Sequence, residues 1–326
     1  MTANGLFRMG YICRNKCVDK IKTHTENKGI FSKFVVAMEE QNYELAGDIL
    51  HRIRKNKLAR KWCRKDLDVF EDYYAIMTKQ RNELQANYNA TDGIDREYYD
   101  FISAKEVAII GPSPAKIENM EEMKDKIVIR FNDRGKAILP EEQVDFPTQI
   151  SFYNGGCSNW IQNNADNSFL YDLKYIVGQE IIKNNFPDKA KERMKIAKNL
   201  NAIFLIGIPN ELPFAMFDLL RCGKKSIEVY SNNLYLSKNV WSDKYNIHSQ
   251  KEQKQMFWWP ILAQHEMSTQ FIFLQNVYRQ GFIHADEELK WVLEHDLKDY
   301  IAKMEELWVM DVIPYKINLN WEENKN

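Results

Sequence analysis

The sequence predicts an α/β protein with a Rossmann-like, mainly parallel sheet and helices on both faces, preceded by a helical N-terminal region. From about residue 104 onward, short apolar runs alternate with segments of helical periodicity, a pattern typical of parallel strands joined by crossover helices. The stretch KEVAIIGPSPAKIENMEEMKDKIVIRFNDRG (105–135) holds two β-branched runs on either side of a helical segment, which makes a βαβ unit. Residues 30–88 contain no proline and favour helix throughout. We therefore divide the chain into a helical region, 1–103, and a Rossmann-like domain, 104–326.

The expected elements follow in order along the chain. Apolar residues at helical spacing within 30–88 predict two or three helices, and the looser NYNATDGIDREYYDF reads as a linker. Strands are expected at 106–110, 127–131, 148–153, 173–177, 202–207 and 226–230. Helices are expected at 117–123, 188–199, 212–222, 264–280 and 286–307.

Composition and cysteine usage favour a cytoplasmic protein. Hydrophobic residues make up 44% of the 326, yet no run approaches the roughly 18 apolar residues of a membrane span, and the N-terminus lacks the apolar core of a signal peptide. Five scattered cysteines are an odd number and read as reduced thiols. Cys13 and Cys17 lie one helical turn apart, but without a second Cys or His pair nearby we expect no metal site.

Charge is unevenly distributed along the chain. HRIRKNKLARKWCRK (51–65) contains eight Lys or Arg and no acid, which leaves 37 basic against 46 acidic residues elsewhere. Such a patch can contact anionic lipid or an anionic polymer, or can be the solvated face of a surface helix. Only Trp62 interrupts it as an aromatic residue, so we expect no nucleic acid partner.

Two strand-end loops offer candidate binding residues. Gly111-Pro112-Ser113-Pro114 matches neither the dinucleotide fingerprint nor the P-loop, but Gly111 would let a ligand approach and Ser113 could donate a hydroxyl. The alternative is an ordinary turn. Asn154 and Gly155 end the third expected strand in a second loop that a ligand could approach.

The second strand ends in Ile-Arg-Phe-Asn. Arg130 and Asn132 lie two residues apart, so on a regular strand their side chains share one face and would point at one pocket. Arg130 suits a phosphate, and Asn132 suits a base edge or ribose. The alternative is that Arg130 pairs with an acid such as Asp133.

Two later segments carry further candidates. Pro209-Asn210-Glu211 opens an expected helix, whose N-terminus favours anions. His265 lies at the start of the helix expected at 264–280, where the helix dipole favours neutral imidazole, the form required of a general base. The alternative is a capping or core-edge histidine.

Three absent motifs narrow the chemistry. No DxD motif stands in an expected strand-end loop, and no HExxH motif or carboxylate cluster suggests a bound metal. The sequence also lacks the GxSxG motif of serine hydrolases.

Four segments in order resemble the sialyltransferases and their bacterial relatives, which transfer sugars from CMP-activated donors. VAIIGPSPAKIENMEEMKDKIVIRFND resembles the long motif of the family, and IPNELPFAMFDLLRCGKKSIEVYSNNLY resembles its short motif. HEMSTQFIFLQNVYRQGFI resembles the final motif, and His248 stands 17 residues before His265, as in the upstream His motif of the family. The resemblance covers roughly residues 105–290 and implies a variant of the glycosyltransferase A-type fold.

The resemblance also implies roles for single residues. His265 would be the general base of an inverting transfer that needs no metal, and His248 would steady the departing phosphate. The expected residues of the donor nucleotide site are Gly111, Ser113, Arg130, Asn132, Asn154, Gly155, Pro209, Asn210, Glu211 and Ser231.

Three departures from the family leave the donor and the activity open. Asn210-Glu211-Leu212 replaces Ser/Thr-Gly, Ser231 replaces Gly, and Gln270 replaces the usual Glu. The donor sugar could be sialic acid, Kdo or another CMP-activated sugar, with no further cofactor and with a bacterial surface glycan or glycolipid, such as capsule or lipopolysaccharide, as acceptor. The alternatives are a scaffold that binds a nucleotide or glycan without turnover, and a transferase that uses another nucleotide sugar.

Overall fold

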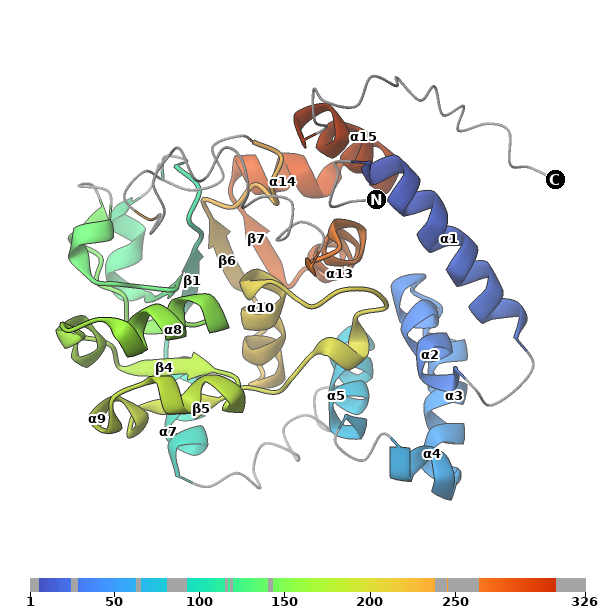
Figure 1. Ribbon diagram of the computed structural model, residues 1–326, viewed down its shortest axis with the longest axis horizontal. Coiled ribbons are helices and arrows are strands. Elements are labelled where there is room, and N and C mark those ends of the chain that lie inside the picture. The colour runs from blue at the N-terminus through green and yellow to red at the C-terminus, as the bar shows by residue number, and fades with distance from the viewer. Residues whose placement is uncertain are drawn as a thin grey trace.

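The computed structural model describes residues 6–24, 29–62, 66–80, 93–114, 117, 120–139, 143–237, 245 and 264–308. Within these ranges seven strands form one sheet in the order β5-β4-β3-β2-β1-β6-β7. Every neighbouring pair of strands is parallel. The strands are β1 (Val107–Ile110), β2 (Ile127–Phe131), β3 (Ile150–Phe152), β4 (Tyr175–Gly178), β5 (Met194–Ile196), β6 (Ile227–Tyr230) and β7 (Ile283–Ala285). The predicted α/β, Rossmann-like class is therefore confirmed (Figure 1).

Helices surround this sheet. The α-helices are α1 (Phe7–Thr23), α2 (Ile30–Glu39), α3 (Tyr43–Lys55), α4 (Lys57–Trp62), α5 (Leu67–Met77), α7 (Ile94–Ser103), α8 (Gly155–Asn163), α9 (Asp188–Lys191), α10 (Glu211–Arg221), α13 (Met267–Arg279), α14 (Glu287–Glu294) and α15 (Leu297–Trp308). Short 3₁₀ helices connect several of them: η2 (Met120–Asp125), η3 (Lys136–Ile138), η5 (Ser168–Tyr171), η6 (Glu180–Asn185) and η7 (Asn201–Ile203).

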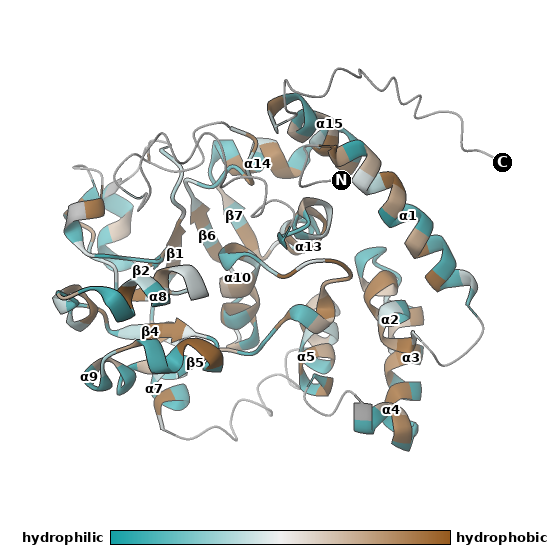
Figure 2. Ribbon diagram, in the orientation of Figure 1, coloured by the Kyte–Doolittle hydropathy of each residue, from teal (hydrophilic) through white to brown (hydrophobic). Residues whose placement is uncertain are grey.

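Both faces of the central strands are buried, as expected of a parallel sheet. Ile109 and Ile129 belong to a large core shared with α10 and α13 on one face. Ala108 and Val128 face the other way, toward a smaller core that contains Met123. Figure 2 shows the same concentration of hydrophobic residues on β1, β6 and β7. The β-branched runs of the sequence thus form the strands because each residue is buried on one face or the other.

The strand order reverses direction between β1 and β6. From β1 the chain builds outward through β2, β3, β4 and β5, and it then returns to add β6 and β7 on the opposite side of β1. In open parallel sheets, ligands bind outside the carboxyl ends of the strands at such a switch point. The loops after β1 and β6 are therefore the first place to look for a site.

Several predicted elements differ from the structure. The apolar run at 202–207 is not a strand, because η7 and a bend occupy it, and β5 and β7 were not predicted. The expected helix at 188–199 breaks after α9 to form β5, and the one at 286–307 divides into α14 and α15. The expected linker contains helix α7. Helix α1, which begins at Phe7, precedes the helices that were expected within 30–88.

The N-terminal helices pack against the rest of the chain. One hydrophobic cluster runs from Phe34 on α2 to Phe273 on α13 and includes Phe217 on α10. The ring of Tyr73 on α5 lies 5.7 Å from that of Phe273 and 6.5 Å from that of Phe217. The main core contains residues from both sides of residue 103. The division of the chain into two domains at that residue therefore stays a prediction. Among the described residues, no helix has the length and apolarity needed to cross a membrane.

Candidate functional site

A cleft of about 480 Å³ opens at the carboxyl ends of the strands, at the switch point. Loops after β1, β2, β3, β4 and β6 contribute to its walls, together with the loop before α10 and the turn before α13. Sequence-predicted residues that line it are Ser113, Asn132, Asn154, Gly155, Pro209, Asn210, Glu211, Ser231 and His265. Residues separated by up to about 150 positions in the chain are thereby brought to one place.

Gly111 lets the loops after β1 and β6 come together. A Cβ at Gly111 would lie 2.3 Å from the carbonyl oxygen of Ser231, closer than any side chain tolerates. The backbone N–H groups of Gly111 and Ser113 donate to the carbonyl oxygens of Tyr230 and Ser231. Gly111 does not line the large cleft, so its role here is to accommodate backbone rather than to admit a ligand.

Ser231 adopts a left-handed conformation with φ 54°. Its N–H donates to Oδ2 of Asp286, which caps the N-terminus of α14 by accepting from Leu289 as well. Burial raises the pKa of Asp286, whereas the hydrogen bonds from the backbone of Leu289 and Ser231 lower it. The serine thus takes the left-handed backbone that glycine favours, at a cost of about 1 kcal/mol.

Ser113 is 5% exposed and contacts α14. Its hydroxyl donates to Oε2 of Glu288 over 3.1 Å and accepts from Asn233 over 3.3 Å. The expected ligand-binding hydroxyl is therefore already engaged in fixing the edge of the cleft.

Asn132 and Asn154 connect the ends of β2 and β3. Oδ1 of Asn132 accepts from the N–H of Asn154 over 3.1 Å, and its amide nitrogen donates to the hydroxyl of Tyr245 over 3.3 Å. Oδ1 of Asn154 accepts from the N–H of Cys157 and caps α8. Both asparagines are thus held in place at the wall of the cleft.

Arg130 does not point into this cleft with Asn132. Arg130 is 5% exposed, and its guanidinium donates to the carbonyl of Phe146 and the hydroxyl of Thr148. Burial lowers the pKa of Arg130 to about 10, although Asp133 opposes the shift. The alternation of a regular strand ends at Phe131, because Asn132 has φ 50° and turns the backbone. Arg130 is therefore a core residue beneath the site.

The loop before α10 is fixed by Gln270. Its Oε1 accepts from the N–H of Asn210 over 3.0 Å, and its Nε2 donates to the carbonyl of Ile208 over 2.9 Å. A glutamate could not make the second bond when ionised, so the departure from the family pattern suits this loop. Asn210 is 7% exposed, and its Oδ1 has no hydrogen-bond partner among the described residues.

His265 precedes α13 and lines the cleft. Its Nδ1 lies 3.0 Å from the carbonyl oxygen of Ile208, which can only accept, so the proton is assigned to Nδ1. In the neutral ring Nε2 then carries the lone pair. The helix N-terminus itself is capped by the carboxylate of Glu266, which accepts from the backbone of Ser268 and Thr269. The carbonyl of Ile208, rather than the helix dipole, orients the imidazole.

Arg134 is a lining residue that the sequence analysis missed. Its guanidinium lies over the rings of Trp160 and Tyr245, at 5.5 and 5.9 Å, and forms no ion pair with a carboxylate in the described part of the chain. Burial lowers the pKa of Arg134, and Cys157 is the largest of the groups that oppose the shift. Arg134 stands two residues after Asn132 of the Arg-x-Asn pattern. The sequence alone does not distinguish it from a surface arginine, because its contact with Trp160 is a tertiary one.

Two tyrosines were also missed. Tyr235 and Tyr245 line the cleft, and burial raises the pKa of both phenols well above the usual value. Both therefore remain protonated at neutral pH. The hydroxyl of Tyr245 donates to the carbonyl of Phe131 over 3.0 Å and so fixes Tyr245 beside Asn132.

The two helices that begin at the cleft differ in charge. The first turn of α10 carries Glu211, which places a negative charge at that N-terminus. The first turn of α8 contains Gly155, Gly156 and no acid. The N-terminus of α8, with Arg134 stacked on Trp160 of the same helix, is therefore the positive pole of the cleft.

Some predictions fall outside the cleft or the described residues. His248 lies outside the described residues, as do Cys63 and the end of the basic segment, residues 63–65. The other four cysteines form no disulfide among the described residues. In the described ranges, no group of three or more His, Cys, Asp or Glu side chains could hold a metal ion.

Comparison of the chain with family models, with curated proteins and with solved structures found no match. The functional assignment therefore depends on the residues of the cleft and on the sequence resemblance described above.

Proposed function

We propose that the protein is an inverting glycosyltransferase that transfers sialic acid, Kdo or a similar sugar from a CMP-activated donor to a hydroxyl of a bacterial surface glycan. The observation that carries the proposal is His265. It stands in the wall of the switch-point cleft with Nδ1 engaged by Ile208, so that Nε2 of the neutral ring can accept a proton. A histidine that only caps a helix or fills the edge of the core would not have to line the cleft, as His265 does.

The charge of the cleft suits an anionic donor. Arg134 and the N-terminus of α8 offer a cation and helix-end amides on one side, and the phosphate of CMP or the carboxylate of the sugar would bind there. This role replaces the one expected of Arg130.

Asn210 supports a ligand with hydrogen-bond donors. Oδ1 of Asn210 is buried without a partner, which costs about 1–3 kcal/mol. A rotation of this side chain toward the cleft that Asn210 lines would let Oδ1 accept from a ribose hydroxyl or a base amino group. Pro209 and Glu211 flank it in the cleft wall. The nucleoside would thus lie toward α10 and the phosphate toward α8.

The proposed reaction proceeds in one displacement. Nε2 of His265 takes the proton of the acceptor hydroxyl while the hydroxyl oxygen forms a bond to the anomeric carbon. The bond from that carbon to the phosphate oxygen breaks, and its electron pair leaves with CMP. In this scheme His248 is proposed to contact the departing phosphate. The scheme includes no metal ion.

The basic segment is proposed to contact an anionic membrane surface from the cytoplasmic side, where a glycolipid acceptor would lie. The side chains of Arg52, Lys55, Lys57 and Arg60 on α3 and α4 are exposed, and Leu58 between them is 54% exposed. Flotation with vesicles containing about 30% phosphatidylserine should recover the protein. Equal recovery with neutral vesicles would contradict an electrostatic contact.

The first experiment compares the wild type with His265→Ala. CMP should raise the thermal stability of both proteins more than UDP, GDP or NAD do, because the nucleotide site remains. His265→Ala should lower the rate of CMP release from CMP-sialic acid or CMP-Kdo by about 10²–10⁴-fold. Undiminished turnover in this variant would refute the assignment of His265 as the general base.

The ligand survey also separates the alternatives. Stabilisation by CMP without turnover of any CMP-sugar would favour the scaffold, and preferential stabilisation by another nucleotide would favour a different transferase.

A further inference from the structure

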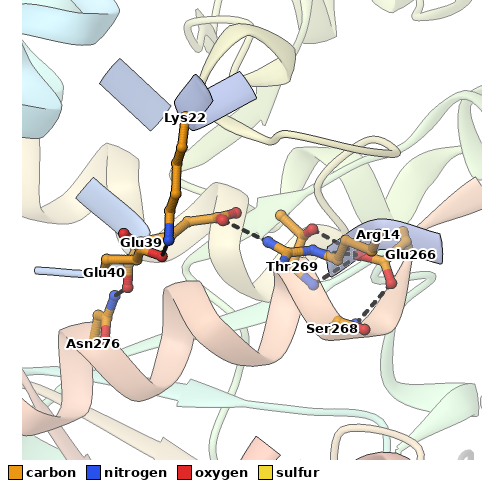
Figure 3. Close-up of polar contacts among 8 residues, drawn as sticks. All are labelled: Arg14, Lys22, Glu39, Glu40, Glu266, Ser268, Thr269 and Asn276. Atoms are coloured by element: carbon orange, nitrogen blue, oxygen red, sulfur yellow. Dashed lines mark hydrogen bonds and ion pairs between the residues drawn. The ribbon is translucent and has the colours of Figure 1, made fainter. Parts of the chain in front are cut away.

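A buried cluster of charges connects the N-terminal helices to the turn that carries His265. Arg14 on α1 is 5% exposed, the side chain of Glu39 at the end of α2 is 9% exposed, and Glu266 before α13 is 6% exposed. The guanidinium Nη2 of Arg14 lies 2.5 Å from Oε2 of Glu39, and its Nε lies 3.9 Å from Oε2 of Glu266. Figure 3 shows these three side chains converging from three helices.

Glu266 is adjacent to His265 and caps α13. Its carboxylate accepts from the N–H groups of Ser268 and Thr269, and from the hydroxyl of Thr269 over 2.6 Å. A cation stabilises a carboxylate buried in this way, and Nε of Arg14 lies at ion-pair distance, beyond hydrogen-bond distance, from it. The start of α13 is thus held from behind by α1.

The same turn is held from the front by the loop after η7. The N–H of Ile208 donates to the carbonyl of Gln264, and Ile208 in turn accepts from His265. Gly207, with φ 77°, packs so closely here that a Cβ would lie 2.8 Å from the carbonyl oxygen of Gln264. His265 therefore lies between two fixed supports.

Glu39 joins α2 to this cluster and also to α13. Burial raises the pKa of Glu39, Arg14 opposes the shift, and the charges of Glu266 and Glu40 add to it. Its backbone carbonyl accepts from the amide of Asn276, one turn before the end of α13. One cation thus serves two buried carboxylates, and its loss would leave both without their partner.

We infer that Arg14 is a positioning residue for the general base, an inference that rests on the proposed function. It fixes Glu266, Glu266 fixes the first turn of α13, and that turn sets the position of His265. Helix α1 is accordingly part of the catalytic unit, although it contributes no residue to the described wall of the cleft.

The chain contains a matched control on the same helix. Lys22 pairs with Glu40, the neighbour of Glu39, but both side chains are nearly half exposed. Within the described residues, neither side chain forms a hydrogen bond or an ion pair with α13. Lys22→Gln removes an α1–α2 ion pair without touching the support of His265. Arg14→Met removes the buried one with a side chain of similar length.

The first experiment measures the rate of turnover in variants of Arg14 and Lys22. Arg14→Met should lower kcat for CMP release by about ten- to a hundredfold while KM for the donor changes by less than about twofold, because only the placement of the base is altered. Arg14→Lys should recover part of kcat, and Lys22→Gln should match the wild type. An unchanged kcat in folded Arg14→Met, or an equal loss in Lys22→Gln, would overturn the inference.

A second readout does not depend on turnover. The ¹⁵N resonances of the His265 ring, assigned with His265→Asn, should shift in Arg14→Met and stay unchanged in Lys22→Gln. If wild-type protein releases no CMP from any donor, the proposed function fails while this comparison still decides the inference. Should Arg14→Met not fold, Arg14→Met/Glu39→Gln removes the charge of one of the two carboxylates left without a cation and should show the same shift. An unshifted His265 signal in the double variant would refute the role of Arg14.

Discussion

At the scale of single residues, Arg134 sets the charge of the cleft. We expect Arg134→Met to weaken CMP binding by about ten- to a hundredfold, since hydrogen bonds to a charged group contribute about 1.5–3 kcal/mol. Lys136→Gln, an exposed cation two residues along the same loop, is the control and should leave binding unchanged. Isothermal titration with CMP measures both, and equal affinities in the two variants would contradict an anion site at Arg134.

Cys157 is the residue whose chemistry should respond most clearly to pH. It lines the cleft, yet burial raises the pKa of its thiol to about 12, with Arg134 opposing and Glu211 adding to the shift. Because only the thiolate reacts, about one thiol in ten thousand is reactive at about pH 8, and the alkylation rate should rise about tenfold per pH unit up to about pH 11.

Mass spectrometry after brief exposure to iodoacetamide checks this expectation. Exposed Cys17 is the internal reference and should be modified first. Modification of Cys157 as fast as Cys17 at about pH 8 would show that the thiol is neither buried nor shifted.

At the scale of elements, the junction of β1 with β6 determines whether the cleft forms. Gly111→Ala places a methyl group 2.3 Å from the carbonyl oxygen of Ser231, so the two loops must separate. We expect a loss of about 1–3 kcal/mol in the free energy of unfolding, together with weaker CMP binding. Gly155→Ala is the control for stability, because a Cβ there meets no atom within 4 Å.

Urea unfolding followed by circular dichroism compares the two variants. Gly155→Ala should be as stable as the wild type or slightly more so, since alanine lowers the entropy of the unfolded chain. Equal stability of Gly111→Ala and the wild type would mean that the loops can part without cost.

The same scale shows what the sequence could predict. Strands β1, β2 and β6 were predicted because each is a β-branched run between clear turn signals. Strands β5 and β7 were not predicted because each short apolar run is interrupted by a charged or titratable residue, Lys195 in β5 and His284 in β7. The run at 202–207 is apolar because Ile203 and Phe204 fill the core from a 3₁₀ turn, which periodicity cannot distinguish from a buried strand.

The candidate site was predictable where loops follow strands directly. Ser113, Asn132, Asn154 and Ser231 follow strand ends, and parallel strands bring such loops to one edge. Arg130 was wrongly assigned to the cleft because the backbone turns at Asn132, which has a left-handed conformation. A glycine at this position would have indicated such a turn in the sequence, but an asparagine does not. The contribution of Arg14 depends on contacts between segments more than 200 residues apart, for which the local pattern contains no signal.

At the scale of the whole molecule, the N-terminal helices and the sheet form one core. Asp72 on α5 pairs with Arg221 on α10 over 2.5 Å, and Tyr98 on α7 donates to Asp218 over 3.0 Å. Asp218 also pairs with Lys195 on β5, and both side chains are almost fully buried. Removing the helices would therefore remove Asp72 from its ion pair with Arg221 and would expose the apolar faces of α10 and α13.

This arrangement predicts that residues 104–326 do not fold alone. Each large apolar side chain that loses its cover forfeits about 1.5–3 kcal/mol, and several such losses equal the 5–15 kcal/mol that stabilises a whole domain. The isolated fragment should bind a hydrophobic dye and unfold without a cooperative transition, whereas coexpression with residues 1–103 should restore a sharp transition and CMP binding. A soluble fragment with its own cooperative transition would place an independent domain after residue 103. It would also remove α1 from the catalytic unit if that fragment released CMP at the rate of the full chain.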